Sequence, residues 1–204
     1  MSALIQKLGL WQGRASFIWL GVVLICLLMA FGAEDAREWG RYEREGLEGG
    51  EFWRLVTGHL VHLSWSHMWL NVAALGLLAA IFGDALSITR CVLVLLGAVV
   101  GIDAGLYLLQ PEIAWYVGLS GVLHGVMAAG SLLLLVHEQA KFGLTLAAVL
   151  LGKLVFEQLF GPLPMTHSAS GGPVIVAAHL YGAVGAALAV LPVILSRYAA
   201  RREL

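Results

Sequence analysis

Residues 118–125 read GLSGVLHG and begin an apolar stretch that continues to about residue 137. The segment holds Ser120 and His124, four residues apart, and glycines where leucines facing lipid would be the ordinary choice. Polar side chains at membrane depth are energetically costly and usually mark a functional site. This stretch therefore predicts a transmembrane helix with a functional site near its beginning.

The composition of the whole chain supports a location in the membrane. Of the 204 residues, 60% are hydrophobic and only 12% are charged, whereas a soluble domain carries about twice that charged fraction. The charges are concentrated between Glu34 and Glu51. The formal net charge of −1 gives no reason to expect binding to nucleic acid. The composition therefore predicts an integral membrane protein whose environment is the lipid bilayer.

A helix that crosses the membrane needs roughly 20 apolar residues, and six stretches approach that length. They are residues 15–33, 67–83, 88–109, 119–137, 142–160 and 174–196. We expect an all-α bundle of six transmembrane helices that forms one domain over residues 1–204. Cys26 and Cys91 lie inside or at the edge of these stretches, so no disulfide framework is expected.

The first stretch has an alternative interpretation. Lys7 and Arg14 precede it and small residues follow it, as in a signal peptide. Its apolar part is long for such a peptide, which favours a retained helix.

The basic residues predict the orientation, because Lys and Arg near the helix ends favour the cytoplasmic side. Seven fall on one side of a six-helix arrangement: Lys7, Arg14, Arg90, Lys141, Arg197, Arg201 and Arg202. Both termini are then cytoplasmic, and the loops 34–66, 110–118 and 161–173 face outward. The first of these loops also contains arginines, but it is long and carries seven acidic residues.

Three of the expected helices carry hydrogen-bonding side chains in their outer halves. His67 and Asn71 are four residues apart and share one helical face, as do Ser120 and His124, and the last stretch carries His179. A single membrane histidine more often holds helices together than forms a site. Three helices that bring such groups to a similar depth favour a site.

Small residues indicate how the fourth and sixth helices meet. Gly121 and Gly125 form a GxxxG pair, and Gly182 shares the face of His179. Small residues let helix backbones approach closely in lipid, although GxxxG alone is a weak signal of function. Close contact here could bring the Ser120 hydroxyl within hydrogen-bond reach of His179, which is the pairing of a nucleophile with a general base.

If the fourth helix begins at Ser120, its start lies below the outer surface of the membrane. A helix from Ser120 to about Val136 is about 25 Å long, which is shorter than a hydrocarbon core of ~30 Å. Irregular backbone before it, including Gly118, must line protein or water. Free backbone N–H groups and the helix dipole at that place suit an oxyanion.

Together these segments resemble the rhomboid intramembrane serine proteases. The matching segments are GLSG in the fourth stretch, HLSWSHMWLN at the second, AHLYGAVG in the sixth and FWR at 52–54. The resemblance implies a six-helix bundle with a water-filled cavity that opens outward. It also implies Ser120 as nucleophile, His179 as base, and an oxyanion hole formed by His67, Asn71 and the Ser120 N–H. It implies no metal or cofactor.

His124 departs from the tyrosine that many rhomboids have four residues after the serine. GLSGVLHG in a chain of this length is similar to the rhombosortase subfamily, bacterial proteins associated with cleavage of C-terminal Gly-Gly-type anchors from exported proteins. This likeness implies membrane-anchored protein substrates and a bacterial inner membrane. We expect His124 to lie beneath His179 and to orient it by hydrogen bonding; the alternative is that it only fills space.

No acidic residue stands out in the sequence as a third member of the site, so a Ser120–His179 dyad is expected. Asp103 is expected to have a structural role. Lys153 and Glu157 are four residues apart in the fifth stretch. They predict an ion pair with each other, or a pair that recognises a polar feature of the substrate anchor.

Two other functions compete with proteolysis. A non-catalytic relative that binds membrane proteins would be expected to lack the serine or the histidine, and both are present. A small transporter would use histidines for metal or protons, with the candidates His59, His62, His67, His124 and His179. It would leave Ser120 and its glycines without a role.

Overall fold

The structure is a computed structural model that describes residues 15–136 and 139–202. Its longest helices are α2 (Ser16–Phe31), α6 (Trp65–Phe82), α7 (Ile88–Leu109), α8 (Ser120–Leu135), α9 (Ala140–Phe160) and α11 (Val176–Arg202). Each coincides with one of the six apolar stretches. The short elements are α3 (Ala33–Gly40), α4 (Arg44–Glu48), α5 (Arg54–Thr57), α10 (Thr166–Ser170), β1 (Tyr42–Glu43) and β2 (Trp115–Tyr116).

Within the described residues, four helices are long and apolar enough to cross a bilayer: α6, α7, α9 and α11. Helix α2 makes a fifth candidate only if it is joined to α3, from which it is bent by 117°. Helix α8 is shorter, with 16 residues, or about 24 Å. The protein is an integral membrane protein, and α8 begins at Ser120, within the predicted stretch 119–137.

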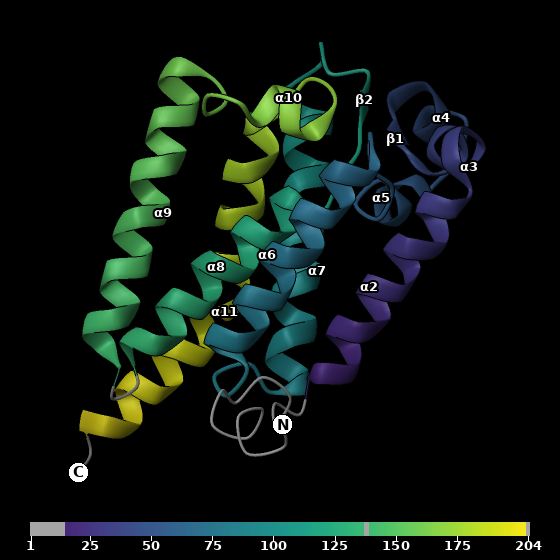
Figure 1. Ribbon diagram of the computed structural model, residues 1–204. Coiled ribbons are helices and arrows are strands. Elements are labelled where there is room, and N and C mark those ends of the chain that lie inside the picture. The colour runs from purple at the N-terminus through teal and green to yellow at the C-terminus, as the bar shows by residue number, and fades with distance from the viewer. Residues whose placement is uncertain (1–14, 137–138, 203–204) are drawn as a thin grey trace.

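The short elements gather at one end of the bundle, while α2 begins and α11 ends at the other (Figure 1). Helices α7 and α9, which carry Arg90 and Lys141 near their starts, also begin at that second end. Two of the other basic residues used to predict orientation, Lys7 and Arg14, lie outside the described residues. For Arg197, Arg201 and Arg202 the structure describes the backbone but not the side chains.

Helix α11 packs closely against both α7 and α8 because glycines line the contacts. A Cβ atom added to Gly182 would lie 2.2 Å from the backbone oxygen of Gly121 on α8. A Cβ atom added to Gly185 would lie 2.1 Å from the backbone oxygen of Gly97 on α7. Only glycine permits these approaches, so the predicted close contact between the fourth and sixth helices is confirmed.

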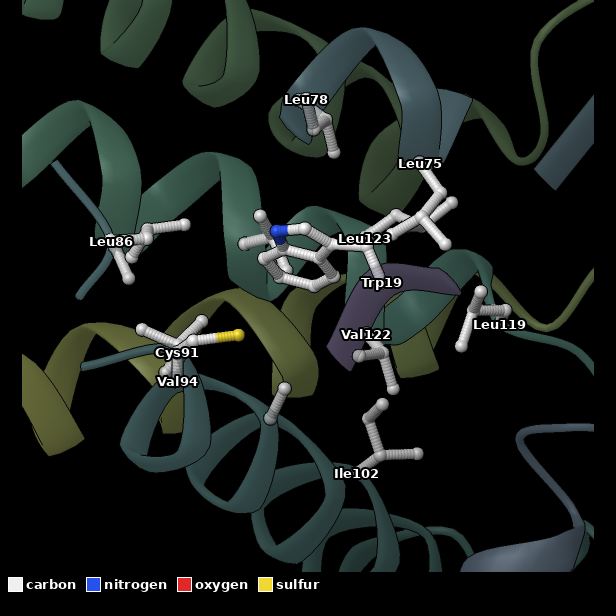
Figure 2. Packing of buried hydrophobic residues seen from close by; sticks show 14 of the residues in the cluster. Trp19, Leu75, Leu78, Leu86, Cys91, Val94, Ile102, Leu119, Val122 and Leu123 are labelled. Atoms are coloured by element: carbon white, nitrogen blue, oxygen red, sulfur yellow. The ribbon is translucent and has the colours of Figure 1, made fainter. Parts of the chain in front are cut away.

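Apolar side chains fill the space between the helices in one large cluster. Figure 2 shows Trp19 of α2, Leu75 of α6 and Leu123 of α8 among the side chains of this cluster. Cys26 and Cys91 are both buried in this cluster and are free thiols. Because α2 contributes Trp19 and Cys26 to the core, its packing favours a helix that stays in the folded protein over a signal peptide.

The all-α expectation missed one feature, a short antiparallel pairing between β1 and β2. It ties the loop 34–66 to the segment before α8, with Tyr42 opposite Tyr116. Two-residue strands carry no alternating pattern that could reveal them. The pairing matters because β2 precedes Ser120 by only four residues.

Two buried polar groups hold the loop 34–66 in place. The Arg54 guanidinium donates to the backbone oxygens of Glu38 and Arg41 at 2.8 and 2.9 Å and pairs with Glu51. His59 Nε2 lies 3.2 Å from Asp103 Oδ1, which anchors the loop to α7. Asp103 thus has the packing role expected of it, and Arg54 of the FWR segment is an organiser of the loop.

Candidate active site

Gly118 shapes the entrance to α8. Its φ of +118° lies in a region that side chains rarely adopt, and a Cβ atom there would come within 2.8 Å of His67 Cε1. Its N–H donates to Gly58 O at 2.9 Å, and the Tyr116 hydroxyl donates to Gly118 O at 2.6 Å. Burial raises the pKa of Tyr116, so its hydroxyl remains a donor. The backbone before Ser120 is therefore held from both sides.

Ser120 is the first residue of α8, and its hydroxyl meets the histidine of α11. Ser120 Oγ lies 3.0 Å from His179 Nε2, which is hydrogen-bond distance. Gly121 and Gly182 make this possible, because the two helices touch backbone to backbone just beside the pair. The structure thus brings together the two residues predicted to be nucleophile and base.

The other ring nitrogen of His179 contacts an acidic residue, which the sequence analysis did not foresee. Glu157 Oε2 of α9 lies 2.9 Å from His179 Nδ1. The sequence singled out no acidic residue as a third member of the site, and the structure places a carboxylate beside the pair. The side chains of Ser120, His179 and Glu157 form one continuous hydrogen-bonded row across three helices.

The sequence held a signal for this contact that could have been used. Glu157 lies three residues before the end of α9, and His179 lies three residues after the start of α11. Both are then about 4.5 Å inside their helix ends, and only the short helix α10 separates the two helices along the chain. Two residues at equal depth on helices joined by a short connection are expected to be neighbours if their side chains lie on the facing sides of the two helices.

Lys153 and Glu157 form the predicted ion pair, with Lys153 Nζ 2.5 Å from Glu157 Oε1. The Glu157 side chain is 1% exposed and that of Lys153 is 29% exposed. Both carboxylate oxygens of Glu157 are therefore engaged inside the protein. This placement does not favour the alternative that Glu157 itself recognises substrate.

His124 lies beside His179, but not in the way expected. The two rings stack with centroids 4.0 Å apart and planes 11° apart. His124 Nδ1 lies 2.7 Å from the backbone oxygen of Ser120 and therefore donates to it. Both nitrogens of His179 are taken by Ser120 and Glu157, so the predicted hydrogen bond from His124 to His179 does not form.

This geometry changes what substitutions of His124 should do. We expect His124→Phe to keep the ring stack and most of kcat, and His124→Gln to lose more, because it keeps polarity without a ring. The measurement is kcat on a membrane-anchored substrate, with His124→Ala for comparison. If the Gln variant outperforms the Phe variant, hydrogen bonding by His124 matters more than stacking.

A cavity of about 230 Å³ opens beside the serine. Ser120, His67, the extended segment around Trp115 and Tyr116, and residues 173–175 line it. The cavity is large enough to hold water, which hydrolysis would need.

The two predicted oxyanion residues are placed differently. His67 lines the cavity, and its Nδ1 accepts from Leu63 N–H at 3.5 Å, which leaves Nε2–H as the donor of the neutral ring. Asn71 is buried but is not among the residues that line the cavity. Its Nδ2 has no hydrogen-bond partner in the described part of the chain. Both side chains have a donor to offer.

Three side chains could in principle hold a metal ion, because ligand atoms of His124, Glu157 and His179 lie within 4.8 Å of one another. In this arrangement those groups already bond to Ser120, to Lys153 and to each other. A metal would have to displace these contacts. The expectation that the site works without metal or cofactor stays a prediction.

A serine and a histidine within hydrogen-bond distance at the start of a helix, inside a membrane bundle, have the geometry that a nucleophile and its general base require. In comparison with known proteins, residues 49–196 match the Rhomboid domain. The chain belongs to the rhomboid family. It is also similar to the Bacillus subtilis (strain 168) protein named "Putative rhomboid protease YdcA", with 29% identity over 109 residues. That match covers 50% of this chain and 55% of the relative.

Proposed function

We propose that the protein is an intramembrane serine protease that cleaves a peptide bond in or near the transmembrane anchor of other membrane proteins. The observation that carries this proposal is the 3.0 Å contact between Ser120 Oγ and His179 Nε2 beside a cavity. Membership of the rhomboid family supports it.

The reaction would run in two stages. Ser120 Oγ attacks the peptide carbonyl while its proton passes to His179 Nε2, and the oxyanion that forms collapses as His179 returns the proton to the leaving amine. This yields a new amino terminus and an acyl ester on Ser120. Water from the cavity, deprotonated by His179, then attacks the ester; His179 returns that proton to Ser120 Oγ as the ester bond breaks and the new carboxyl terminus is released. No external reactant besides water is needed.

We propose that the oxyanion is held by the Ser120 N–H at the start of α8, with donors from His67 and Asn71. These groups would meet full negative charge only in the transition state. His67→Ala and Asn71→Ala should therefore each lower kcat by about 10²–10³-fold, as loss of one such donor does in a soluble protease, with a smaller change in KM. Steady-state kinetics on one substrate separates the two effects. A rise in KM with unchanged kcat would show that these residues only position substrate.

The proposed substrates are exported proteins held in the membrane by a C-terminal anchor, of the Gly-Gly type cleaved by rhombosortases. The segment GLSGVLHG, with His124 where other rhomboids have tyrosine, supports this subfamily. We further propose a six-helix arrangement in a bacterial inner membrane, with both termini cytoplasmic and the cavity on the outer side. Helix α2 begins and α11 ends at the same end of the bundle (Figure 1), which supports an arrangement with both termini on one side of the membrane.

The test uses purified protein in proteoliposomes with a panel of anchored reporter proteins. The panel should include Gly-Gly-type C-terminal anchors and the same anchors with both glycines replaced by leucine. We expect cleavage of the first set, at a bond that mass spectrometry of the products locates. Cleavage of both sets alike would contradict the subfamily assignment but not the protease.

The competing functions give different results in the same assay. A non-catalytic binding protein would retain the reporters uncut. A transporter would need histidines that change protonation along a path, but burial lowers the pKa of His62 to about 3, and His59 is tied to Asp103. The low pKa of His62 and the contact of His59 with Asp103 favour hydrolysis over transport.

A further inference from the structure

We infer that Glu157 is a positioning residue that makes the site a Ser120–His179–Glu157 triad, with Lys153 as the counter-ion of the carboxylate. This inference rests on the proposed protease function and adds to it. The starting point is the row of contacts that runs from Ser120 through His179 and Glu157 to Lys153, with separations of 3.0, 2.9 and 2.5 Å.

The first argument concerns the tautomer of His179. An ionised carboxylate only accepts hydrogen bonds, so the contact with Glu157 places a proton on His179 Nδ1. A neutral imidazole with its proton on Nδ1 has a free lone pair on Nε2. That lone pair faces Ser120 Oγ and can take the hydroxyl proton. Glu157 therefore selects the form of His179 that can act as a base.

The second argument concerns charge. When Ser120 attacks, His179 becomes an imidazolium at a site where it is only 6% exposed. Such a cation would be costly in this poorly hydrated interior unless a fixed opposite charge were present. The Glu157 carboxylate supplies that charge in advance. It would stabilise the transition state more than the resting state, which is what raises kcat.

Lys153 explains how Glu157 can carry a charge at this depth. A carboxylate that is 1% exposed needs a partner and hydrogen bonds to stay ionised. Lys153 occupies one carboxylate oxygen and His179 the other. The more exposed ammonium of Lys153 reaches from α9 itself, one turn before Glu157. Before the reaction, the four hydrogen-bonded side chains therefore carry a net charge close to zero, with one negative charge on Glu157 and one positive charge on Lys153.

A purely structural role is the competing explanation, since an ion pair and a hydrogen bond also join α9 to α11. The two roles differ in what a substitution changes. A structural role predicts lost stability in proportion to lost activity. A positioning role predicts a fall in kcat in protein that is still folded, with KM little changed.

The experiment measures kcat, KM and thermal stability in proteoliposomes for Glu157→Asp, Glu157→Gln and the double variant Lys153→Met with Glu157→Gln. The double variant avoids leaving an unpaired ammonium behind. Lys141→Gln is the matched control, since it removes one charge from an exposed position at the start of the same helix. The fluorophosphonate labelling rate of Ser120 is measured alongside.

We expect kcat to fall by about 10²–10⁴-fold in Glu157→Gln and in the double variant, by analogy with the loss of the triad carboxylate in soluble proteases. Glu157→Asp should recover part of the loss because it keeps the charge. Lys141→Gln should match the wild type. The labelling rate should fall in step with kcat.

The outcomes separate this inference from the function on which it rests. Wild-type kcat in folded Glu157→Gln, together with an inactive Ser120→Ala, would overturn the triad and leave the dyad. A change in KM alone would overturn it in favour of substrate recognition. Wild-type activity in Ser120→Ala would overturn the protease itself. If Glu157→Gln fails to fold, kcat of the double variant decides between the two roles. If neither variant folds, Lys153 and Glu157 have a structural role and the inference is overturned.

Discussion

Replacing Ser120 with alanine should abolish proteolysis while the protein remains folded. In soluble serine proteases, loss of the nucleophile lowers kcat by about 10⁶-fold, and the residual rate here should not exceed background. The physical reason is that no covalent intermediate can form once Oγ is absent. The small side chain of alanine fits the same place at the start of α8, so thermal stability should hardly change. His179→Ala should give the same loss, because Ser120 would then keep its proton.

Ser131 provides the matched control for this prediction. It lies on the same helix and is also buried, but its hydroxyl donates to Met127 O and has no part in the site. Ser131→Ala should therefore retain wild-type kcat. Turnover by Ser120→Ala above background, with the same product termini, would mean that the serine is not the nucleophile.

Replacing Gly182 with alanine should disrupt the contact between α8 and α11 on which the site depends. The added Cβ would lie 2.2 Å from the backbone oxygen of Gly121, and backbone atoms cannot yield as a flexible side chain does. Overpacking of this kind costs about 1–3 kcal/mol or more, which corresponds to a fall in Tm of about 2–12 °C for a chain of this size. Activity should fall much further than stability, because Ser120 and His179 move apart when the helices separate.

Gly76 is the control for that substitution. It is a helical glycine of α6, and an added Cβ would have no atom of the described residues within 4 Å apart from its own stretch of helix. Gly76→Ala should leave kcat unchanged and raise Tm slightly, since alanine restricts the unfolded chain. The comparison uses thermal unfolding and cleavage of one anchored substrate. If Gly182→Ala and Gly76→Ala have the same Tm and kcat, the close contact between α8 and α11 is not required for stability or activity.

The helical framework could be predicted from the sequence because the bilayer imposes a simple rule. Long apolar stretches become helices, and each of the six predicted stretches overlaps one. The start of α8 was also predictable, since Pro111 and Gly118 interrupt the helix before Ser120. The loop 34–66 was less predictable. Elements such as α5 and the pairing of β1 with β2 depend on tertiary contacts, including those of Arg54, and not on a periodic pattern.

The candidate site was predictable in part. Polar residues at one depth and glycines on facing helices suggested the contact of Ser120 with His179. The partner of the other His179 nitrogen was missed because i, i+4 spacing already explained Glu157 through Lys153. A contact across helices depends on how each helix is rotated about its axis, and hydropathy does not give that rotation. For the same reason His124 was placed beside His179 but assigned the wrong bond.

The most direct test of the central claim is to locate the covalent adduct of a fluorophosphonate by peptide mass spectrometry. The probe reacts only with a serine that a base has activated. We predict one adduct, on Ser120, which disappears in Ser120→Ala and His179→Ala and persists in Ser131→Ala. An adduct on another residue, or labelling that survives both site substitutions, would contradict the assignment of Ser120 and His179 as nucleophile and base.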